Sequence, residues 1–143
     1  MAEETRREQI GSVTLDLSHY PGEDLYCDGE VEDRILEIAK NHPEEEFDAI
    51  IREAKDWPTL YHLSSIRGNI VGWIPFEGNE KVLEIGAGPG AITGVLTSRC
   101  GQVDCVDLSR KRSLINAYRH RDCGNLTIHV GNFEDVEPEL DRD

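Results

Sequence analysis

Residues 81–90 read K-V-L-E-I-G-A-G-P-G, and this stretch decides the fold of the chain. Its first half is apolar and partly β-branched, which is typical of a strand buried on both faces. Glycines follow at three alternate positions from Gly86 to Gly90, and glycine suits a tight bend because it readily adopts positive φ. Apolar residues then recur at helical spacing from Ala91 to Leu96. The stretch therefore predicts a strand, a glycine loop and a helix in succession.

Two more strands are predicted beyond this unit. Residues 103–107 form one and the alternating residues 126–130 form the other, with an amphipathic helix over about 110–120 between them. Strands that alternate with helices predict an α/β fold with a parallel sheet, right-handed crossovers and the strand order third, second, first. The first strand would then be an exposed apolar edge, and we expect self-association through it.

Residues 1–60 are expected to form a region of their own, mainly helical, ahead of the sheet domain at 61–143. It begins with one short strand over 13–17, where apolar and polar residues alternate, and a turn follows at Tyr20-Pro21-Gly22. The rest of the region is predicted to be helical because its apolar residues recur every three or four positions.

Two helices are predicted in this region. The first is capped by Asp28 and runs to Lys40. The second begins near Pro43, a residue that suits a first helical turn, and ends at Trp57-Pro58 because the residue before a proline disfavours helical backbone.

A third helix is predicted between the helical region and the sheet, from Ser64 or Ser65 to Pro75. Its apolar residues Ile66, Ile70 and Trp73 share one side of the helix, so we expect them to pack inward. This helix would deliver the chain to the first strand of the sheet.

Composition limits the class of protein. The net charge is −14, with 19 acidic and 7 basic residues in 1–80 against 10 and 8 in 81–143, and such a field argues against a nucleic-acid backbone as the main partner. The basic cluster of 110–121 is interpreted as the solvated side of a helix. No apolar run is long enough to span a bilayer and 1–10 lacks a signal-peptide core, so a cytoplasmic protein without a membrane partner is expected.

The four cysteines show no metal-ligand spacing, and no metal site is predicted. They are Cys27, Cys100, Cys105 and Cys123. We interpret them as reduced and mostly buried thiols.

Candidate ligand-binding residues lie where each of the three strands ends. The glycines follow the first strand, Asp107 ends the second and Asn132 follows the third, and ligands bind at the carboxyl ends of such strands. Asp107 comes 21 positions after Gly86, the spacing at which an acid meets the hydroxyls of an adenosine ribose. The pattern therefore favours a ligand that contains adenosine.

Glu84 bears on which adenosine ligand this is. Gly86, Gly88 and Ala91 also spell G-x-G-x-x-A, so an NAD(P)-binding oxidoreductase is one alternative. A carboxylate two residues before the first glycine would repel a pyrophosphate but suit an ammonium or sulfonium group. Glu84 can instead be a structural acid satisfied by loop amides, and a non-catalytic interaction module on the same fold also stays open.

At these residues the chain resembles the class I S-adenosylmethionine-dependent methyltransferases. V-L-E-I-G-A-G-P-G is similar to their first motif, V-D-C-V-D-L-S to the stretch with the ribose-binding acid, and H-V-G-N-F-E-D to the loop near the adenine. The stretch L-S-S-I-R-G-N-I-V-G-W-I-P-F resembles the helix ahead of that motif in a group of bacterial members. The resemblance covers roughly residues 61–136.

The resemblance implies a cofactor, S-adenosyl-L-methionine, and a methyl acceptor that the sequence does not identify. It implies that the glycines approach the methionine and ribose, that Glu84 bears on the methionine end, that Asp107 holds the ribose, and that Leu108 and Phe133 pack on the adenine. The cofactor-binding residues implied are Glu84, Gly86, Ala87, Gly88, Gly90, Asp107, Leu108, Asn132 and Phe133. No catalytic base is assigned, and Tyr61 and His62 are candidates for a lid over the cofactor.

Two features depart from the family. Asn132 stands where an aspartate often accepts from the adenine amine, and its amide oxygen can accept without a charge. The family's sheet usually continues for four more strands, whereas this chain ends at Asp143. We therefore expect the cofactor half of an enzyme, without the acceptor-binding loops and inactive alone.

Overall fold

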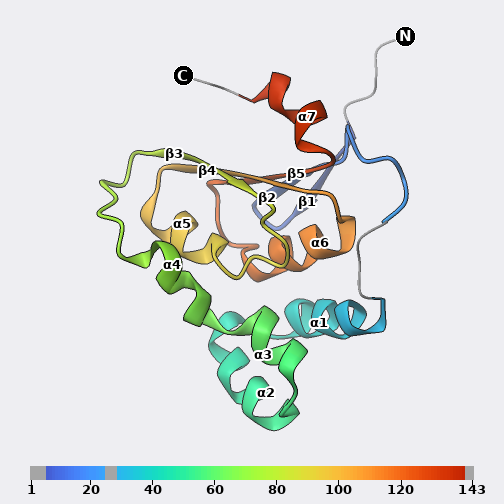
Figure 1. Ribbon diagram of the computed structural model, residues 1–143, viewed down its shortest axis with the longest axis vertical. Helices are drawn as coiled ribbons and strands as arrows, with labels where there is room; N and C mark the ends of the chain where they lie inside the picture. Colours follow the sequence, from blue (N-terminus) through green and yellow to red (C-terminus); the bar gives the residue numbers. More distant parts are fainter. Residues whose placement is uncertain (1–5, 25–28, 141–143) are drawn as a thin grey trace.

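The computed structural model describes residues 6–24 and 29–140, and its centre is a five-stranded sheet (Figure 1). The strands are β1 (Arg7–Ile10), β2 (Val13–Asp16), β3 (Lys81–Ile85), β4 (Gln102–Asp107) and β5 (Leu126–Val130), in the order β1-β2-β5-β4-β3. All neighbours pair in parallel except β1 and β2. The fold is α/β and Rossmann-like, and the predicted order of the last three strands, with β3 at the edge, is confirmed.

The two crossover helices cover one face of the sheet. They are α5 (Thr93–Arg99) and α6 (Arg110–Arg119), and Ser109 caps α6 by accepting from the Arg112 N–H. Inward side chains of β2, β4 and β5 meet α5 and α6 in one hydrophobic core that includes Leu15, Cys105 and Ile128, each fully buried. On the other face Figure 1 shows only the short helix α7 (Phe133–Val136).

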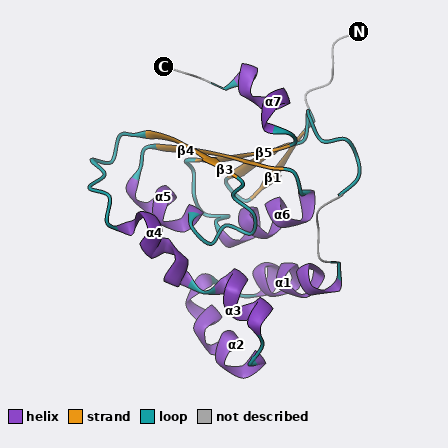
Figure 2. Cartoon of the chain, viewed as in Figure 1, coloured by secondary structure: helices purple, strands orange, loops and turns teal. Residues whose placement is uncertain are grey.

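A second helical layer packs under α6, on the side away from the sheet (Figure 2). It contains α1 (Glu30–Asn41), the 3₁₀ turn η1 (Glu44–Glu46), α2 (Phe47–Ala54) and α3 (Trp57–Leu63); η2 (Ser65–Gly68) and α4 (Asn69–Gly72) then lead to β3, and η3 (Glu137–Glu139) follows α7. Ile35, Phe47 and Leu63 of this layer are buried against Ile115 of α6. The layer therefore has its own small core on the back of α6.

The sheet is wider than the three strands predicted. Residues 7–16 form a hairpin around Gly11, which has φ 59°, and β2 pairs with β5 inside the sheet. The strand at 13–17 was predicted but not its place in the sheet, and β1 was missed. The pairing depends on contacts far along the chain, such as the bond from the Ser12 N–H to the Arg121 carbonyl at 2.7 Å.

The helical region differs from the prediction at its proline. Trp57-Pro58 opens α3 rather than only ending the previous helix, because Asp56 caps α3 by accepting from the Thr59 N–H at 2.8 Å. A proline in a first turn loses no helical hydrogen bond. The helix before it, α2, ends at Ala54, and its C-cap Lys55 has left-handed backbone with φ 52°. The predicted cap Asp28 lies outside the described residues, and α1 begins at Glu30 after Gly29.

The prediction that Ile66, Ile70 and Trp73 pack inward is wrong. Their side chains are 69%, 59% and 76% exposed. The segment is a 3₁₀ turn followed by one short helical turn, and Gly68 approaches α5 so closely that a Cβ there would collide with Val95. The face of this segment that contains Gly68 therefore packs on α5. Ile66, Ile70 and Trp73 lie on the face that points away from α5, toward solvent.

The basic residues of α6 were expected to form a solvated face, but four of them form ion pairs with acids from other elements. Arg110 pairs with Glu8 at 3.3 Å, Lys111 with Asp33 at 2.6 Å, Arg112 with Glu32 at 2.5 Å and Arg119 with Glu44 at 2.6 Å. These acids come from the hairpin and the helical layer. The acidic excess of the first half of the chain is thus partly neutralised by the helix on which that half packs.

Within the part of the chain that is described, no helix is both long and apolar enough to cross a membrane. Cys100, Cys105 and Cys123 are free thiols, the first two buried. Cys27 lies outside the described residues.

Candidate functional site

The glycine loop leaves the end of β3 with two glycines open to space. Gly86 has φ 72° and Gly88 has φ 56°, and no atom lies within 4 Å of where a Cβ would stand on either residue. The Gly86 N–H bonds the Val106 carbonyl at 2.8 Å, which anchors the loop to β4. A ligand can therefore approach the backbone at both glycines.

Gly90 has a different environment from the other two glycines. It also has positive φ, 87°, but a Cβ there would collide with the Asn116 side chain of α6 and lie 3.1 Å from the ring of His120, the C-cap of that helix. Gly90 thus allows the loop to pack closely on α6, and it lies beneath the loop rather than on its open side.

Asp107 ties the glycine loop to the end of β4. One carboxylate oxygen accepts from the Gly88 N–H and the other from the Ser109 N–H, each at 2.9 Å. Each oxygen keeps a second lone pair for a ligand. The side chain therefore stands, already oriented, between the loop and the start of α6.

Two cavities meet at this point and share Gly86, Asp107 and Arg112. The larger, about 530 Å³, lies between the glycine loop and the helical layer and is lined by Val31, Trp57, Pro58, Tyr61, His62, Arg67, Gly86, Ala87, Gly88, Pro89, Asp107 and Arg112. The smaller, about 410 Å³, is lined by Ile85, Gly86, Val106, Asp107, Leu108, Arg112, Gly131, Asn132 and Phe133. Tyr61 and His62, the candidate lid residues, line the larger one.

The smaller cavity brings together the residues expected around an adenine. Leu108 is 46% exposed, and Phe133 begins α7 beside it. The Asn132 amide oxygen caps α7 by accepting from the Glu134 N–H at 3.0 Å. This oxygen, expected to accept from an adenine amine, already holds one hydrogen bond, so a second would use its other lone pair.

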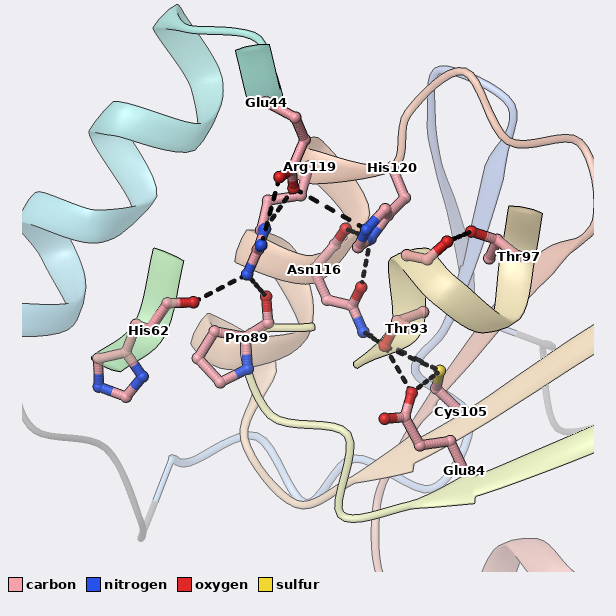
Figure 3. Close-up of polar contacts among 11 residues, drawn as sticks. Glu44, His62, Glu84, Pro89, Thr93, Thr97, Cys105, Asn116, Arg119 and His120 are labelled. Carbon is pink, nitrogen blue, oxygen red and sulfur yellow. Dashed lines mark hydrogen bonds and ion pairs between the residues drawn. The ribbon is translucent and has the colours of Figure 1, made fainter. Parts of the chain in front are cut away.

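Glu84 points away from both cavities, into the layer between the sheet and its helices (Figure 3). The Thr93 hydroxyl donates to its Oε1 at 2.5 Å, and the Cys105 thiol lies 3.5 Å from the same atom. Burial raises the pKa of the carboxyl, and the charge of Asp107 adds to this, whereas the Thr93 bond and Arg67 oppose it. Its bonds come from side chains rather than from the loop amides considered above.

The structure thus brings seven of the nine candidate cofactor residues to the two cavities. The other two, Glu84 and Gly90, line neither cavity and face the layer between the sheet and α6. Arg67 and Arg112 were missed. Arg67 stacks on Tyr61, with 4.5 Å from its guanidinium carbon to the ring centroid. Arg112 lies in the first turn of α6, the helix that follows Asp107, and that position next to a strand end was the available signal.

No family model matches the chain, and no curated protein matches it. Solved structures resemble it at low identity, among them the following three. Phosphoethanolamine N-methyltransferase 1 of Haemonchus contortus, with phosphoethanolamine and S-adenosylhomocysteine, is 21% identical with a TM-score of 0.47, over 75% of this chain and 22% of that one. The O-methyltransferase TomG of Streptomyces achromogenes, with SAM, is 18% identical with a TM-score of 0.45, over 82% and 50%.

A putative S-adenosyl-L-methionine-dependent methyltransferase of Methanococcus maripaludis is 19% identical with a TM-score of 0.39, over 63% of this chain and 42% of that one. The chain thus spans half or less of the length of each of these three proteins. Because these similarities are weak, the function is inferred from the geometry of the site alone.

Proposed function

We propose that the chain binds S-adenosylmethionine across the carboxyl ends of β3, β4 and β5 and is the cofactor-binding portion of a methyltransferase. One observation carries the proposal. Asp107 stands where the two cavities meet, oriented by the Gly88 and Ser109 amides, with open backbone at Gly86 and Gly88 on one side and Phe133 on the other. A ribose at Asp107 would extend an adenine into one cavity and the methionine into the other.

The residues present fit the two ends of this cofactor. Leu108 and Phe133 give the smaller cavity the apolar surface that an adenine ring needs. The space above Gly86 and Gly88 admits a ligand to the backbone. Arg67, on the wall of the larger cavity, offers a cation to the methionine carboxylate.

When bound, the cofactor supplies an electrophilic methyl group on a sulfonium. The protein's part in such a transfer is to hold that methyl in line with the acceptor atom, which is mainly a matter of position. The Asp107 carboxylate, which fixes the ribose, and the glycine loop, which fixes the chain beyond it, serve this purpose. The acceptor and any catalytic base are left unassigned.

An NAD(P) site is the rival proposal. Arg67 and Arg112 on the larger cavity would attract a pyrophosphate. Against it, the helix after the loop begins only at Thr93, and Gly90 is held down on Asn116. A dinucleotide fold places the pyrophosphate at a helix N-terminus directly after the glycines.

Asp107→Ala tests the proposal. The variant loses two charge-assisted hydrogen bonds to the ribose, on the order of 2–4 kcal/mol, so calorimetric titration should show S-adenosylmethionine binding at least tenfold weaker. Asp104→Ala is the matched control, because Asp104 lies on the same strand but bonds His129 at 3.0 Å and lines neither of the two cavities. An unchanged dissociation constant in Asp107→Ala would reduce Asp107 to a structural strand-end residue.

A further inference from the structure

Arg119 joins three parts of the molecule that lie far apart in the sequence. Its side chain, at the end of α6, is only 3% exposed. Its Nε donates to Glu44 at 2.6 Å and its Nη2 to the same carboxylate at 3.4 Å. Its Nη1 donates to the His62 carbonyl at 2.9 Å and to the Pro89 carbonyl at 3.1 Å (Figure 3).

The two carbonyls belong to opposite walls of the larger cavity. His62 lies in α3, on the helical-layer wall, and Pro89 lies in the glycine loop. Because Nη1 of Arg119 bonds both carbonyls, this one nitrogen fixes the distance between α3 and the glycine loop. Glu44 balances the buried charge, and the Phe47 ring lies 5.5 Å from the guanidinium carbon, so the group has little freedom to turn.

The loop side of this contact is held by Asn116 of α6 and by His120, which caps the end of that helix. The Asn116 amide donates to the Thr93 hydroxyl at 3.1 Å, and Thr93 in turn donates to Glu84. The Asn116 amide oxygen is 2.8 Å from His120 Nδ1. The glycine loop is thus bonded to Arg119 at Pro89, and the chain just after it is bonded to Asn116 at Thr93. The side of the loop at Gly86 and Gly88 is open.

The arginine side chain is specific for this task. Its planar fork donates from three separated nitrogens and so reaches the carboxylate and two carbonyls at once, whereas the three donors of a lysine ammonium all lie on one nitrogen. We propose that Arg119 is a positioning residue that sets the separation of α3 from the glycine loop, and with it the shape of the larger cavity for the ligand. Only the identity of that ligand, S-adenosylmethionine, rests on the proposed function.

Hydrogen exchange of the ligand-free protein tests the contact without any assumption about function. In Arg119→Lys the amides of α3 and of residues 86–92 should both exchange about tenfold faster, because both walls are released together, while β4 and β5 stay protected. Arg110→Lys is the matched control, since Arg110 is on the same helix but pairs with Glu8, and it should leave both segments unchanged. Faster exchange in only one of the two segments, or uniformly over the chain, would overturn the proposal.

Glu44→Gln provides a second variant if Arg119→Lys does not fold. It removes the charge that orients the guanidinium, so the same two segments should exchange faster, and a change confined to the surroundings of residue 44 would contradict the proposal. The affinity for S-adenosylmethionine should fall about tenfold in Arg119→Lys and not in Arg110→Lys. Equal affinity in the wild type and in Arg119→Lys would overturn the positioning role of Arg119. If the wild type does not bind S-adenosylmethionine, the proposed function is refuted, and the hydrogen-exchange result alone tests whether Arg119 sets the separation of α3 from the glycine loop.

Discussion

Alanine at Gly90 should be far more harmful to the fold than alanine at Gly86, although both glycines belong to one motif. Both have positive φ, 87° and 72°. A Cβ at Gly86 meets no atom within 4 Å, whereas a Cβ at Gly90 collides with the Asn116 side chain, which is fully buried and bonded to Thr93 and His120. The two variants therefore share backbone strain and differ in packing.

The expected loss follows from these two effects. Left-handed backbone costs an alanine about 1–2 kcal/mol, and this is the whole penalty at Gly86. Overpacking a well-filled site adds about 1–3 kcal/mol, so Gly90→Ala should lose about 2–5 kcal/mol in total. Displacing Asn116 would also break its bond to the Thr93 hydroxyl.

Urea unfolding followed by tryptophan fluorescence measures this difference. With a slope of about 1–3 kcal/mol per molar urea, the unfolding midpoint of Gly90→Ala should lie well below that of Gly86→Ala. Gly86→Ala should instead weaken ligand binding, because its methyl group enters the open side of the loop. Equal midpoints for the two variants would show that α6 does not press on the loop at Gly90, and would refute the reasoning.

Two other predictions concern His120 and the β3 edge. Burial, with the charge of Arg119 adding to it, lowers the pKa of His120 to about 4. As pH falls from about 6.5 toward 4, His120 is therefore protonated in the unfolded chain but stays neutral in the folded protein. The free energy of unfolding should fall by at most about 3 kcal/mol over this range. His120→Gln should flatten the dependence of the free energy of unfolding on pH in this range, and an unchanged slope would refute the role of His120. His42→Gln is the control, because the His42 side chain is 41% exposed. The raised pKa of Glu84 acts in the opposite direction, but Glu84 is present in the wild type and in both variants. We also propose self-association through β3, where Leu83 and Ile85 are 42% and 59% exposed: sedimentation should show a concentration-dependent dimer that Leu83→Lys abolishes, and a wild-type monomer at all concentrations would contradict it.

The order of the last three strands, and the edge where their carboxyl ends meet, could be predicted because both depend on local patterns. The strands of 81–130 alternate with helices, and right-handed parallel crossovers leave only a few strand orders, among them the observed order β5-β4-β3. That order puts Gly86, Asp107 and Asn132 at one edge of the sheet whatever the rest of the chain does. Motif spacing and topology were therefore enough to predict that these three residues lie at one edge of the sheet.

Features that depend on distant parts of the chain could not be predicted in this way. β1 and β2 join the sheet through β5, more than a hundred positions later. The cations of α6 face acids of the first half of the chain, and Gly68 turns Trp73 outward through its contact with Val95. Hydrophobic spacing indicates which residues share a face but not which neighbour that face meets.

Gly90 and Glu84 illustrate the same limit within the motif. A glycine that opens toward a ligand and a glycine that packs on a helix read identically in the sequence. The Asn116 side chain that separates them lies 26 positions later. Likewise, Glu84 is held by Thr93 and Cys105 across the layer between sheet and helices, rather than by its own loop.

An amide NMR titration of the ¹⁵N-labelled chain with S-adenosylmethionine, and in parallel with NAD, tests the central claim most directly. We predict saturable shifts with S-adenosylmethionine at the amides of Gly86, Gly88, Leu108 and Phe133, which surround the two cavities, and none at Gly11 in the distant hairpin turn. NAD should cause no saturable shifts at these positions. Saturation by NAD alone, or S-adenosylmethionine shifts that avoid the ends of β3, β4 and β5, would contradict the account.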